Sequence, residues 1–450
     1  IDLGVMVPAA DILREAREHD VDVIWLSGLI TPSLEEMVYN ARQMEKQGFT
    51  IPLLIGGATT SKIHTAVKID PEYSGPVVHV KDASRAVGVV SKLLSSDAKE
   101  SFVAEVNAEH DRMREARSGK WEGRELLPLE EVRAKRFDPG WSGYEPLVPA
   151  KIGVTEMNDV PISTLARYID WAYFFVAWDI VGKWPAILND EKYGEEARKL
   201  YADAKMMIER MINEGNVHAH GVCGIFPANS TYDDRIEIYE DESKENVLAV
   251  LPTLRQQQQK KDTNTYLSLC DYIAPKESGK TDWIGAFAVT AGVGLERIVA
   301  EFDAVDDDYS SILVKILADR LAEAFAEYMH LIVRTKLWAY APNESLTVDE
   351  LLRIQYQGIR PAPGYPPCPD HREKDVIWKL LDPESTCGIG LTESKMMTPG
   401  ASVSGFYYSH PQSRYWGVGK LGKDQVEDYA KRMGTSLSET ERWLTSQLGY

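Results

Sequence analysis

The chain has 450 residues, of which 44% are hydrophobic and 26% charged, and its formal net charge is −19. These proportions are ordinary for a globular protein, and the acidic excess argues against nucleic-acid binding, which needs Lys and Arg to neutralise phosphates. No run of about 18 apolar residues is present, so we expect no transmembrane helix and no membrane partner.

The first hundred residues alternate between apolar runs and helical patterns. Strands are expected at 1–7, 21–27, 51–57 and 76–80, and helices near 9–19, 33–47, 61–69 and 83–96. The expected strands are almost continuously apolar, which is typical of a parallel sheet covered on both faces. This alternation predicts a doubly wound α/β domain over residues 1–100.

Small residues and hydroxyls follow three of the expected strands, in S-G-L-I-T (27–31), G-G-A-T-T (56–60) and K-D-A-S (81–84). Ligands of parallel sheets bind beyond the carboxyl ends of the strands. Gly56 and Gly57 would let a flat ligand approach the backbone, and the hydroxyls of Ser27 and Thr31 could donate to it. Turn formation and helix capping would explain the same residues equally well.

The pattern changes after the first domain. Residues 101–125 are charged and predict a helical linker. Residues 126–450 contain helical blocks at 161–178, 194–213 and 309–338, with alternating strand patterns at 235–239, 246–251, 283–290 and 405–409. Segregated helices and alternating strands predict an α+β domain with an antiparallel sheet and long helices.

Carboxylates in this second domain stand among apolar neighbours. Asp170 lies within Y-I-D-W-A-Y-F-F, and a charge there needs either an internal partner or a bound cation. Glu323 and Glu327 are one helical turn apart on one face. Such a pair is usually a solvated stripe, but the apolar residues around it predict a mostly buried helix and favour a working carboxylate.

The stretch R-P-A-P-G-Y-P-P-C-P-D-H (360–371) can be neither a helix nor an interior strand, because proline fixes φ and removes a backbone donor. It is either a polyproline linker or a rigid wall that presents Arg360, the Ala362 backbone and Tyr365 to a small molecule. The helical patterns on both sides of it, at 348–357 and 373–381, favour the wall. Arg360 could then hold a carboxylate through two hydrogen bonds.

The cysteines, histidines and two adjacent tyrosines are the remaining residues of interest. Four cysteines far apart, without a C-x-x-C pair, favour a reducing cytoplasm and argue against zinc. The nine histidines include one close pair, His218 and His220, and we expect no metal site built from this chain. Tyr407 and Tyr408 would point to opposite faces of a strand.

Longer segments of the first domain carry a family resemblance. V-M-V-P-A, L-S-G-L-I-T-P-S-L-E-E-M and I-P-L-L-I-G-G-A-T-T-S-K-I-H-T-A-V-K-I resemble the cobalamin-binding domain of the cobalamin-dependent methionine synthase family. The resemblance implies cobalamin contacts at Ser27, Thr31, Gly56, Gly57 and Ala83. The family's D-x-H-x-x-G motif, whose histidine ligates cobalt, is absent, so we expect it upstream in a longer polypeptide of which this chain is a C-terminal fragment.

The second domain resembles the activation domain of the same family, through Y-I-D-W, D-W-I-G-A-F-A-V-T, A-D-R-L-A-E-A-F-A-E-Y and Q-G-I-R-P-A-P-G-Y-P. This resemblance implies S-adenosylmethionine contacts at Asp170, Glu323, Arg360, Ala362, Tyr407 and Tyr408. It places Tyr365 where the corrin approaches. The chain departs from the family at Ile354, where some members carry a carboxylate, so one polar contact would be missing.

The resemblance also implies a function. The family transfers a methyl group from methyltetrahydrofolate through cobalamin to homocysteine, and its activation domain rescues oxidised cob(II)alamin with an electron and a methyl group from S-adenosylmethionine. We expect a methyltransferase fragment that carries this reactivation, acts in the cytoplasm as a monomer and uses no side chain as an acid or base. Homocysteine and folate modules, with their zinc, are expected elsewhere in the polypeptide.

The electron donor implied by the resemblance is a flavodoxin or a flavodoxin-like reductase. Such donors are acidic, so docking to this acidic chain would need a local basic patch. The candidates are residues 192–199 and 255–261, the latter including Lys260 and Lys261. Two alternatives remain, a non-catalytic corrinoid carrier or sensor and a flavodoxin-like receiver. The second domain argues against the former, and the lack of clustered acids at strand ends argues against the latter.

Overall fold

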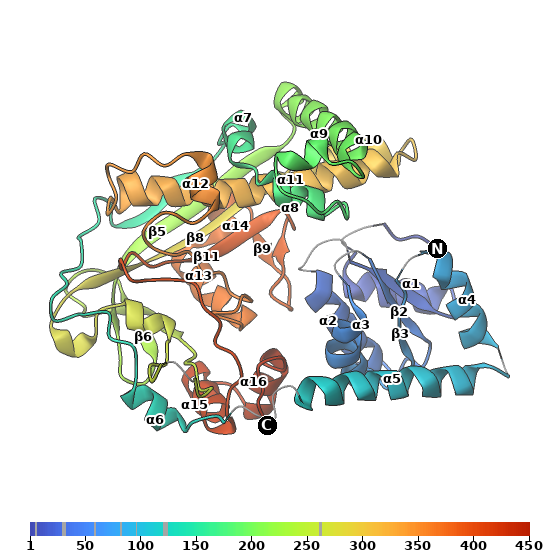
Figure 1. Cartoon of the computed structure of the whole chain (residues 1–450), viewed down its shortest axis with the longest axis horizontal. Coiled ribbons are helices and arrows are strands. Elements are labelled where there is room, and N and C mark those ends of the chain that lie inside the picture. The colour runs from blue at the N-terminus through green and yellow to red at the C-terminus, as the bar shows by residue number, and fades with distance from the viewer. Residues whose placement is uncertain are drawn as a thin grey trace. The chain divides into compact units, whose positions relative to one another are not determined.

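The computed structural model describes residues 1–4, 7–28, 33–57, 60–81, 83–95, 97–119, 125–260 and 263–450. These residues form two compact units, Ile1–Glu125 and Leu126–Tyr450 (Figure 1). Each unit has its own sheet and its own hydrophobic core.

The sheet of the first unit consists of three parallel strands in the order β1 (Ile24–Ser27), β2 (Leu53–Gly56) and β3 (Val77–His79). The helices between and after them are α1 (Ala9–Glu18), α2 (Ser33–Lys46), α3 (Lys62–His64) with a π-helical continuation (Thr65–Ile69), and α4 (Ala83–Leu94). Leu53 and Ile55 pack in one core cluster and Leu54 in another, because successive side chains of a strand point to opposite faces. Both faces of the sheet are therefore covered, as the apolar runs predicted.

The expected strand at residues 1–7 is not formed in its described part, residues 1–4 and 7. β1 is the edge of the described sheet, and Ile1 and Leu3 are 81% and 38% exposed. An apolar segment becomes a strand only when a neighbour takes its backbone hydrogen bonds and its side chains are covered. Ile1 and Leu3 lack that cover here, so this expectation was wrong.

The charged segment after the first domain forms the helix α5 (Lys99–Gly119). It packs onto the first unit through Phe102, Val103 and Val106, which join the core cluster of Leu54. The imidazole Nδ1 of its buried His110 lies 3.0 Å from a carboxylate oxygen of Asp70. A few apolar positions and a buried histidine–carboxylate contact thus dock this helix, although its charged composition predicted a linker.

The second unit is built on an antiparallel sheet in the order β11-β8-β5-β6-β7, with β4 also paired to β5. Its strands are β4 (Gly153–Met157), β5 (His218–Ser230), β6 (Arg235–Tyr239), β7 (Val247–Pro252), β8 (Asp282–Val293) and β11 (Ser402–Tyr407), and a short pair is formed by β9 (Gly390–Leu391) and β10 (Met397–Thr398). The antiparallel sheet confirms the predicted α+β class. The sequence patterns had located β6, β7, β8 and β11, but not the long central strand β5.

Helices cover both faces of this sheet (Figure 1). The helices of this unit are α6 (Leu129–Ala134), α7 (Ile162–Leu165), α8 (Trp171–Val176), α9 (Gly194–Glu214), α10 (Leu295–Asp303), α11 (Asp308–Ile332), α12 (Val348–Leu352), α13 (Lys374–Leu381), α14 (Pro383–Cys387), α15 (Lys423–Met433) and α16 (Leu437–Trp443). Those that contact the sheet include α10, α11, α13, α14 and α15. A Cβ added to Gly221 would meet Met329 and Phe325 of α11, whereas one added to Gly224 would meet Leu381 of α13. The two helices therefore pack on opposite sides of β5.

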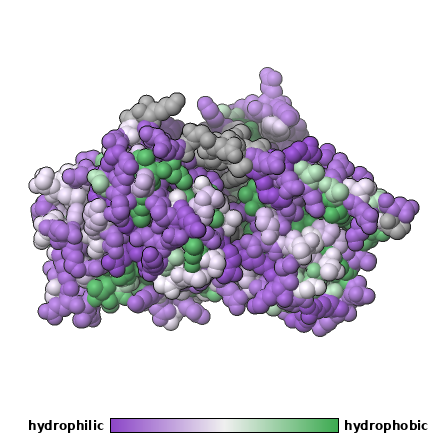
Figure 2. All heavy atoms as spheres, turned by 90° about the horizontal axis from the view of Figure 1, so that it is seen from below, coloured by the Kyte–Doolittle hydropathy of each residue, from purple (hydrophilic) through white to green (hydrophobic). Residues whose placement is uncertain are grey.

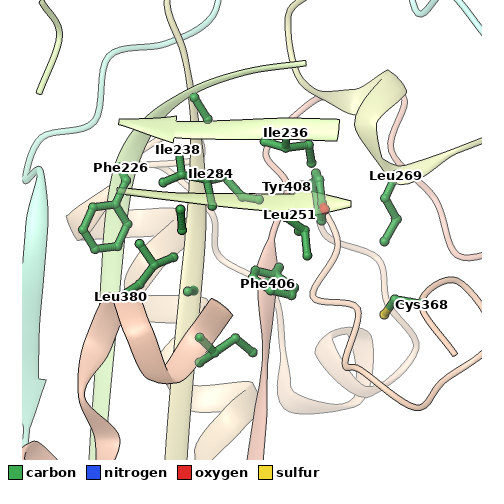
Figure 3. Packing of buried hydrophobic residues seen from close by; sticks show 14 of the residues in the cluster. Phe226, Ile236, Ile238, Leu251, Leu269, Ile284, Cys368, Leu380, Phe406 and Tyr408 are labelled. Carbon is green, nitrogen blue, oxygen red and sulfur yellow. The ribbon is translucent and has the colours of Figure 1, made fainter. Parts of the chain in front are cut away.

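The core beneath α13 contains buried residues of β5 to β8 and of β11 (Figure 3). Tyr408 and Phe406 belong to it, together with Ile236, Leu251 and Leu380. On the face seen in Figure 2 most atoms belong to hydrophilic residues. Among the described residues, no helix is long and apolar enough to cross a membrane.

Candidate ligand-binding site

A cavity of about 500 Å³ opens in the second unit between α11, β8, β11 and the proline-rich stretch. This volume is within the range of small-molecule sites. Its lining includes the predicted residues Glu323, Arg360, Ala362 and Tyr365. Further lining comes from Phe287, Pro361, Pro366, Pro367, Val403, Tyr415, Trp416 and Gly417.

The proline-rich stretch is held along the outer edge of β11. Ile359 and Tyr408 exchange two backbone hydrogen bonds of 3.0 Å, and the N–H of Phe406 donates to the carbonyl of Pro361. Pro361 can sit there because a proline still offers its carbonyl to a neighbouring strand. A Cβ at Gly405 would lie 2.7 Å from that carbonyl oxygen, so glycine permits the close approach. Arg360 is thereby fixed between two anchored neighbours.

The rest of the stretch closes on itself. The N–H of Gly364 donates to the Cys368 carbonyl at 2.8 Å, and the N–H of Cys368 donates back to Tyr365 at 3.0 Å. The Ala362 carbonyl accepts from the Tyr365 N–H and from the Cys368 thiol. Burial raises the pKa of Cys368 well above its usual range, so the thiol stays neutral. These hydrogen bonds make the stretch a rigid wall of the cavity, on which Tyr365 is 55% exposed.

Gly364→Ala should lower the free energy of unfolding by more than 2 kcal/mol, roughly the most that a positive φ alone costs an L residue. Gly364 has φ +98°, and an added Cβ would lie 2.1 Å from the His371 ring, so a steric clash adds to the backbone strain. Gly388→Ala is the matched control, because Gly388 has φ +73° with nothing within 4 Å. Urea unfolding of both variants measures the difference. Equal losses would show that the His371 ring moves aside freely.

Arg360 is held by side chains of α11 and of the segment before the stretch. Its Nη2 donates to Oε2 of Glu327 at 2.6 Å, and its Nη1 donates to the Tyr356 hydroxyl at 2.5 Å. Nη1 also lies 3.2 Å from Nδ1 of His330. Burial disfavours the charged guanidinium, but Glu327, together with Tyr356 and Tyr415, outweighs burial and raises the pKa of Arg360, which stays charged. Burial, with Arg334 and Arg360, lowers the pKa of His330, so the neutral ring can accept from Arg360.

Glu323 and Glu327 have different environments although both lie on α11. Glu327 is 2% exposed and paired with Arg360, whereas the exposed Glu323 lines the cavity. The helix is mostly buried, as predicted. The cavity thus presents a negative group and a positive group to the same space. That arrangement suits a ligand with a cationic and a carboxylate end.

The two tyrosines lie beside this site without lining it. Both are 0% exposed. The Tyr407 ring stacks between Phe287 and His330, with centroids 4.7 and 4.9 Å away. Tyr408 points into the core on the other side of the strand (Figure 3), as expected of neighbouring strand residues. Tyr407 therefore supports Phe287, which is part of the cavity wall.

Asp170 does not line the cavity either. The expected helix at 161–178 is divided there into α7, a 3-10 turn (Ala166–Tyr168) and α8. The Asp170 carboxylate accepts from the Ala172 N–H at 2.9 Å and caps α8. An N-cap side chain accepts a hydrogen bond from a backbone N–H that has no partner within the helix. Asp170 does this for α8, so the predicted single helix is interrupted at this residue. This contact is an internal partner for Asp170, while its contact with a bound cation stays a prediction.

The first-unit candidates lie at the carboxyl edge of its sheet. Ser27 is exposed and is the register partner of Gly56, whose carbonyl accepts from the Gly28 N–H. Gly57 has φ +100°, and a Cβ there would lie 2.3 Å from the Gly28 carbonyl. The close approach of these two loops therefore requires glycine at position 57, whether or not a ligand binds. Thr31 lies outside the described residues, and of Ala83 only its place at the start of α4 is described.

Within the predicted basic patch at 255–261, Lys260 is half-buried, and docking there stays a prediction. Arg255 is fully buried and binds Asp234 and Asp271, so it is not available for docking. Lys261 lies outside the described residues. The other candidate, residues 192–199, is exposed at Lys192 but also carries exposed acids.

Comparisons with known proteins agree with this architecture. Residues 161–434 match the family model of the vitamin B12-dependent methionine synthase activation domain, and residues 1–70 match the B12 binding domain. The chain resembles a crystal structure of the MetH reactivation domain bound to AdoHcy, with 51% identity and a TM-score of 0.70 over 72% of this chain and 99% of that one.

Fold and family matches define a protein with a B12-binding unit followed by an activation domain. Because the activation-domain match spans more than half of its residues, the chain belongs to the vitamin B12-dependent methionine synthase activation-domain family. The recognition made from sequence motifs is confirmed. The expected cofactors, cobalamin and S-adenosylmethionine, agree with the B12-binding match and with the AdoHcy-bound relative.

Proposed function

We propose that this chain serves the reductive reactivation of cobalamin, with S-adenosylmethionine as the methyl donor. The family match and the AdoHcy-bound relative support this function. The observation that carries it is the cavity in which Glu323 and Arg360 face one space. S-adenosylmethionine is a zwitterion with an additional sulfonium charge, so it needs one site for cations and another for a carboxylate.

In this proposal the residues of the cavity bind S-adenosylmethionine and orient it. Arg360 would receive the amino-acid carboxylate, since the described contacts use three of its five N–H donors. Glu323 would face the cationic end, and the Ala362 backbone, Tyr365 and Phe287 would form the wall. Tyr407 would act through Phe287. The reactive chemistry would belong to the cofactor and the sulfonium, and we propose no side chain as acid or base.

The first unit would hold cobalamin at the carboxyl edge of its sheet, near Ser27, Gly56 and Gly57. Ligands of doubly wound folds bind at that edge, and the B12-binding match supports this placement. The exposed Ser27 hydroxyl is available there. Thr31 and Ala83 remain candidates for the same cofactor. We further propose a flavodoxin or a flavodoxin-like reductase as electron donor, and homocysteine and folate modules as partners of the same enzyme.

Asp170 could bind the ligand or only cap α8, and a substitution distinguishes the two roles. Asp170→Asn removes the charge while asparagine keeps the capping oxygen. If Asp170 contacts the cationic ligand, this change should weaken S-adenosylmethionine binding about tenfold, the equivalent of roughly 1.4 kcal/mol. Isothermal titration calorimetry measures it, and Asp190→Asn is the control, since Asp190 also accepts from backbone N–H groups. Unchanged affinity would assign Asp170 to capping alone, and no binding by wild type at millimolar ligand would overturn the proposed function.

A further inference from the structure

Three potential metal ligands meet on the surface of the second unit. Nδ1 of His218 lies 3.1 Å from Oδ1 of Asp159, and Nε2 of His220 lies 3.3 Å from the same oxygen. One ligand atom from each of the three residues lies within 4.8 Å of the others. None of the three lines the cavity described above.

Two independent features of the backbone bring these side chains together. His218 and His220 lie two positions apart at the start of β5, where the register with β8 shifts, and their ring centroids are 6.0 Å apart. Asp159 has φ +54° in the turn before α7, and the next N–H, of Val160, donates to the Ala219 carbonyl at 3.0 Å. The turn is therefore pinned between the two histidines. This contact joins positions some 60 residues apart, so the histidine pair alone did not reveal it.

The donor set is that of a transition-metal site. Imidazole nitrogens and a carboxylate oxygen are common ligands of Zn²⁺ and of Co²⁺. The side chains of Asp159, His218 and His220 are 72%, 47% and 24% exposed, so an ion could enter and keep water in its remaining positions. All four cysteines are buried, so thiols do not compete for added metal.

We propose that Asp159, His218 and His220 bind one divalent transition-metal ion of the Zn²⁺ class. The ion would replace the hydrogen bonds to Asp159 and fasten the turn that leads into α7 onto β5. This site is independent of cobalamin and of S-adenosylmethionine. It would be a metal site of the chain's own residues, which the histidine pattern alone did not predict.

Titration with Zn²⁺ alone, followed by calorimetry, tests the site. Wild type should bind one equivalent, and His218→Ala, His220→Ala and Asp159→Asn should each weaken binding at least tenfold. His19→Ala is the matched control, because His19 is a half-exposed histidine beside a single carboxylate, Glu15. It should bind Zn²⁺ as wild type does.

Two further measurements distinguish metal binding from a fold defect. The variants should keep the metal-free melting temperature of wild type, while Zn²⁺ should raise the melting temperature of wild type alone. Co²⁺ should give a visible absorption band in wild type that the three variants lose. Equal Zn²⁺ affinity in wild type and His218→Ala, or no binding by wild type at 1 equivalent of Zn²⁺ and about 100 μM protein, would overturn the proposal.

Discussion

Replacing Arg360 by alanine should weaken S-adenosylmethionine binding by roughly 10- to 150-fold. Hydrogen bonds to charged groups contribute about 1.5–3 kcal/mol, and each 1.4 kcal/mol is tenfold in affinity. Arg360 is the cation of the cavity wall, and its neighbours Ile359 and Pro361 are pinned to the β11 edge. Calorimetric titration of wild type and variant with S-adenosylmethionine and with AdoHcy measures the loss.

The same substitution also affects folding, because Arg360 is the partner of a buried carboxylate. Without it Glu327 would be left without a cation, and breaking a buried pair costs about 3–5 kcal/mol. Arg360→Lys should therefore be measured beside Arg360→Ala. A lysine keeps the positive charge next to Glu327 but lacks the planar guanidinium that can form two parallel hydrogen bonds. We expect Arg360→Lys to remain folded and still bind ligand more weakly than wild type.

Glu327→Gln is the control for this pair. Glutamine can still accept a hydrogen bond from Arg360, so the guanidinium should stay in place while the stability falls. If Arg360 binds the ligand directly, Glu327→Gln should weaken binding less than Arg360→Ala does. Wild-type affinity in a folded Arg360→Lys or Arg360→Ala protein would remove Arg360 from the site.

A loss of stability of similar size, about 3–5 kcal/mol, is expected from Arg255→Met. Arg255 is 0% exposed and donates to both oxygens of Asp271, at 2.7 and 2.8 Å, and to Asp234. Arg133 donates to the other oxygen of Asp234. Methionine fills similar space but leaves the Asp271 carboxylate buried without its cation. Urea unfolding of wild type and variant gives the difference.

An exposed ion pair provides the matched control for Arg255. Arg353 lies 3.0 Å from Asp349, and their side chains are 67% and 70% exposed. Arg353→Met should change the unfolding free energy by less than about 1 kcal/mol, because solvent screens such pairs. Similar losses in the two variants would mean that burial of the Arg255 cluster adds nothing.

The Arg255 cluster also predicts a dependence on pH. Burial disfavours the Asp234 carboxylate, but Arg255 and Arg133 outweigh it and lower its pKa. Its contribution to stability is therefore complete above the unfolded pKa of about 4 and is lost as the pH falls through the lower folded pKa. The stability difference between wild type and Arg255→Met should shrink in acid accordingly.

The fold class followed from the sequence because its signals were local. Near-continuous apolar runs marked β1 to β3, and alternation marked β6 to β8. β5 gave no such signal, although it is the central strand. Its glycines lower strand propensity, yet a Cβ at Gly221 would clash with side chains of α11, and one at Gly224 with Leu381 of α13. Tertiary packing thus requires glycine at positions where a local sequence pattern argues against a strand.

The candidate site was predictable in its residue types but not in its pairings. The residue pattern offered Arg360 and the pair Glu323 and Glu327, and the family resemblance singled out Glu323. Arg360 and Glu323 both line the cavity. The partner of Arg360 was not foreseen: Glu327 stood in the same pattern as Glu323, one helical turn away. Only the rotation of α11 decides which of the two is buried. The Phe287–Tyr407–His330 stack joins three elements, and no local signal could have revealed it.

The position of the proline-rich stretch on β11 has a consequence for solubility. β11 is the last strand of its sheet, and an unpaired strand edge is a template for association with other chains. Ile359 and Pro361 occupy this edge, and the prolines that follow offer no N–H to extend the ladder. The segment that shapes the cavity therefore also covers this edge of the sheet against pairing with another chain.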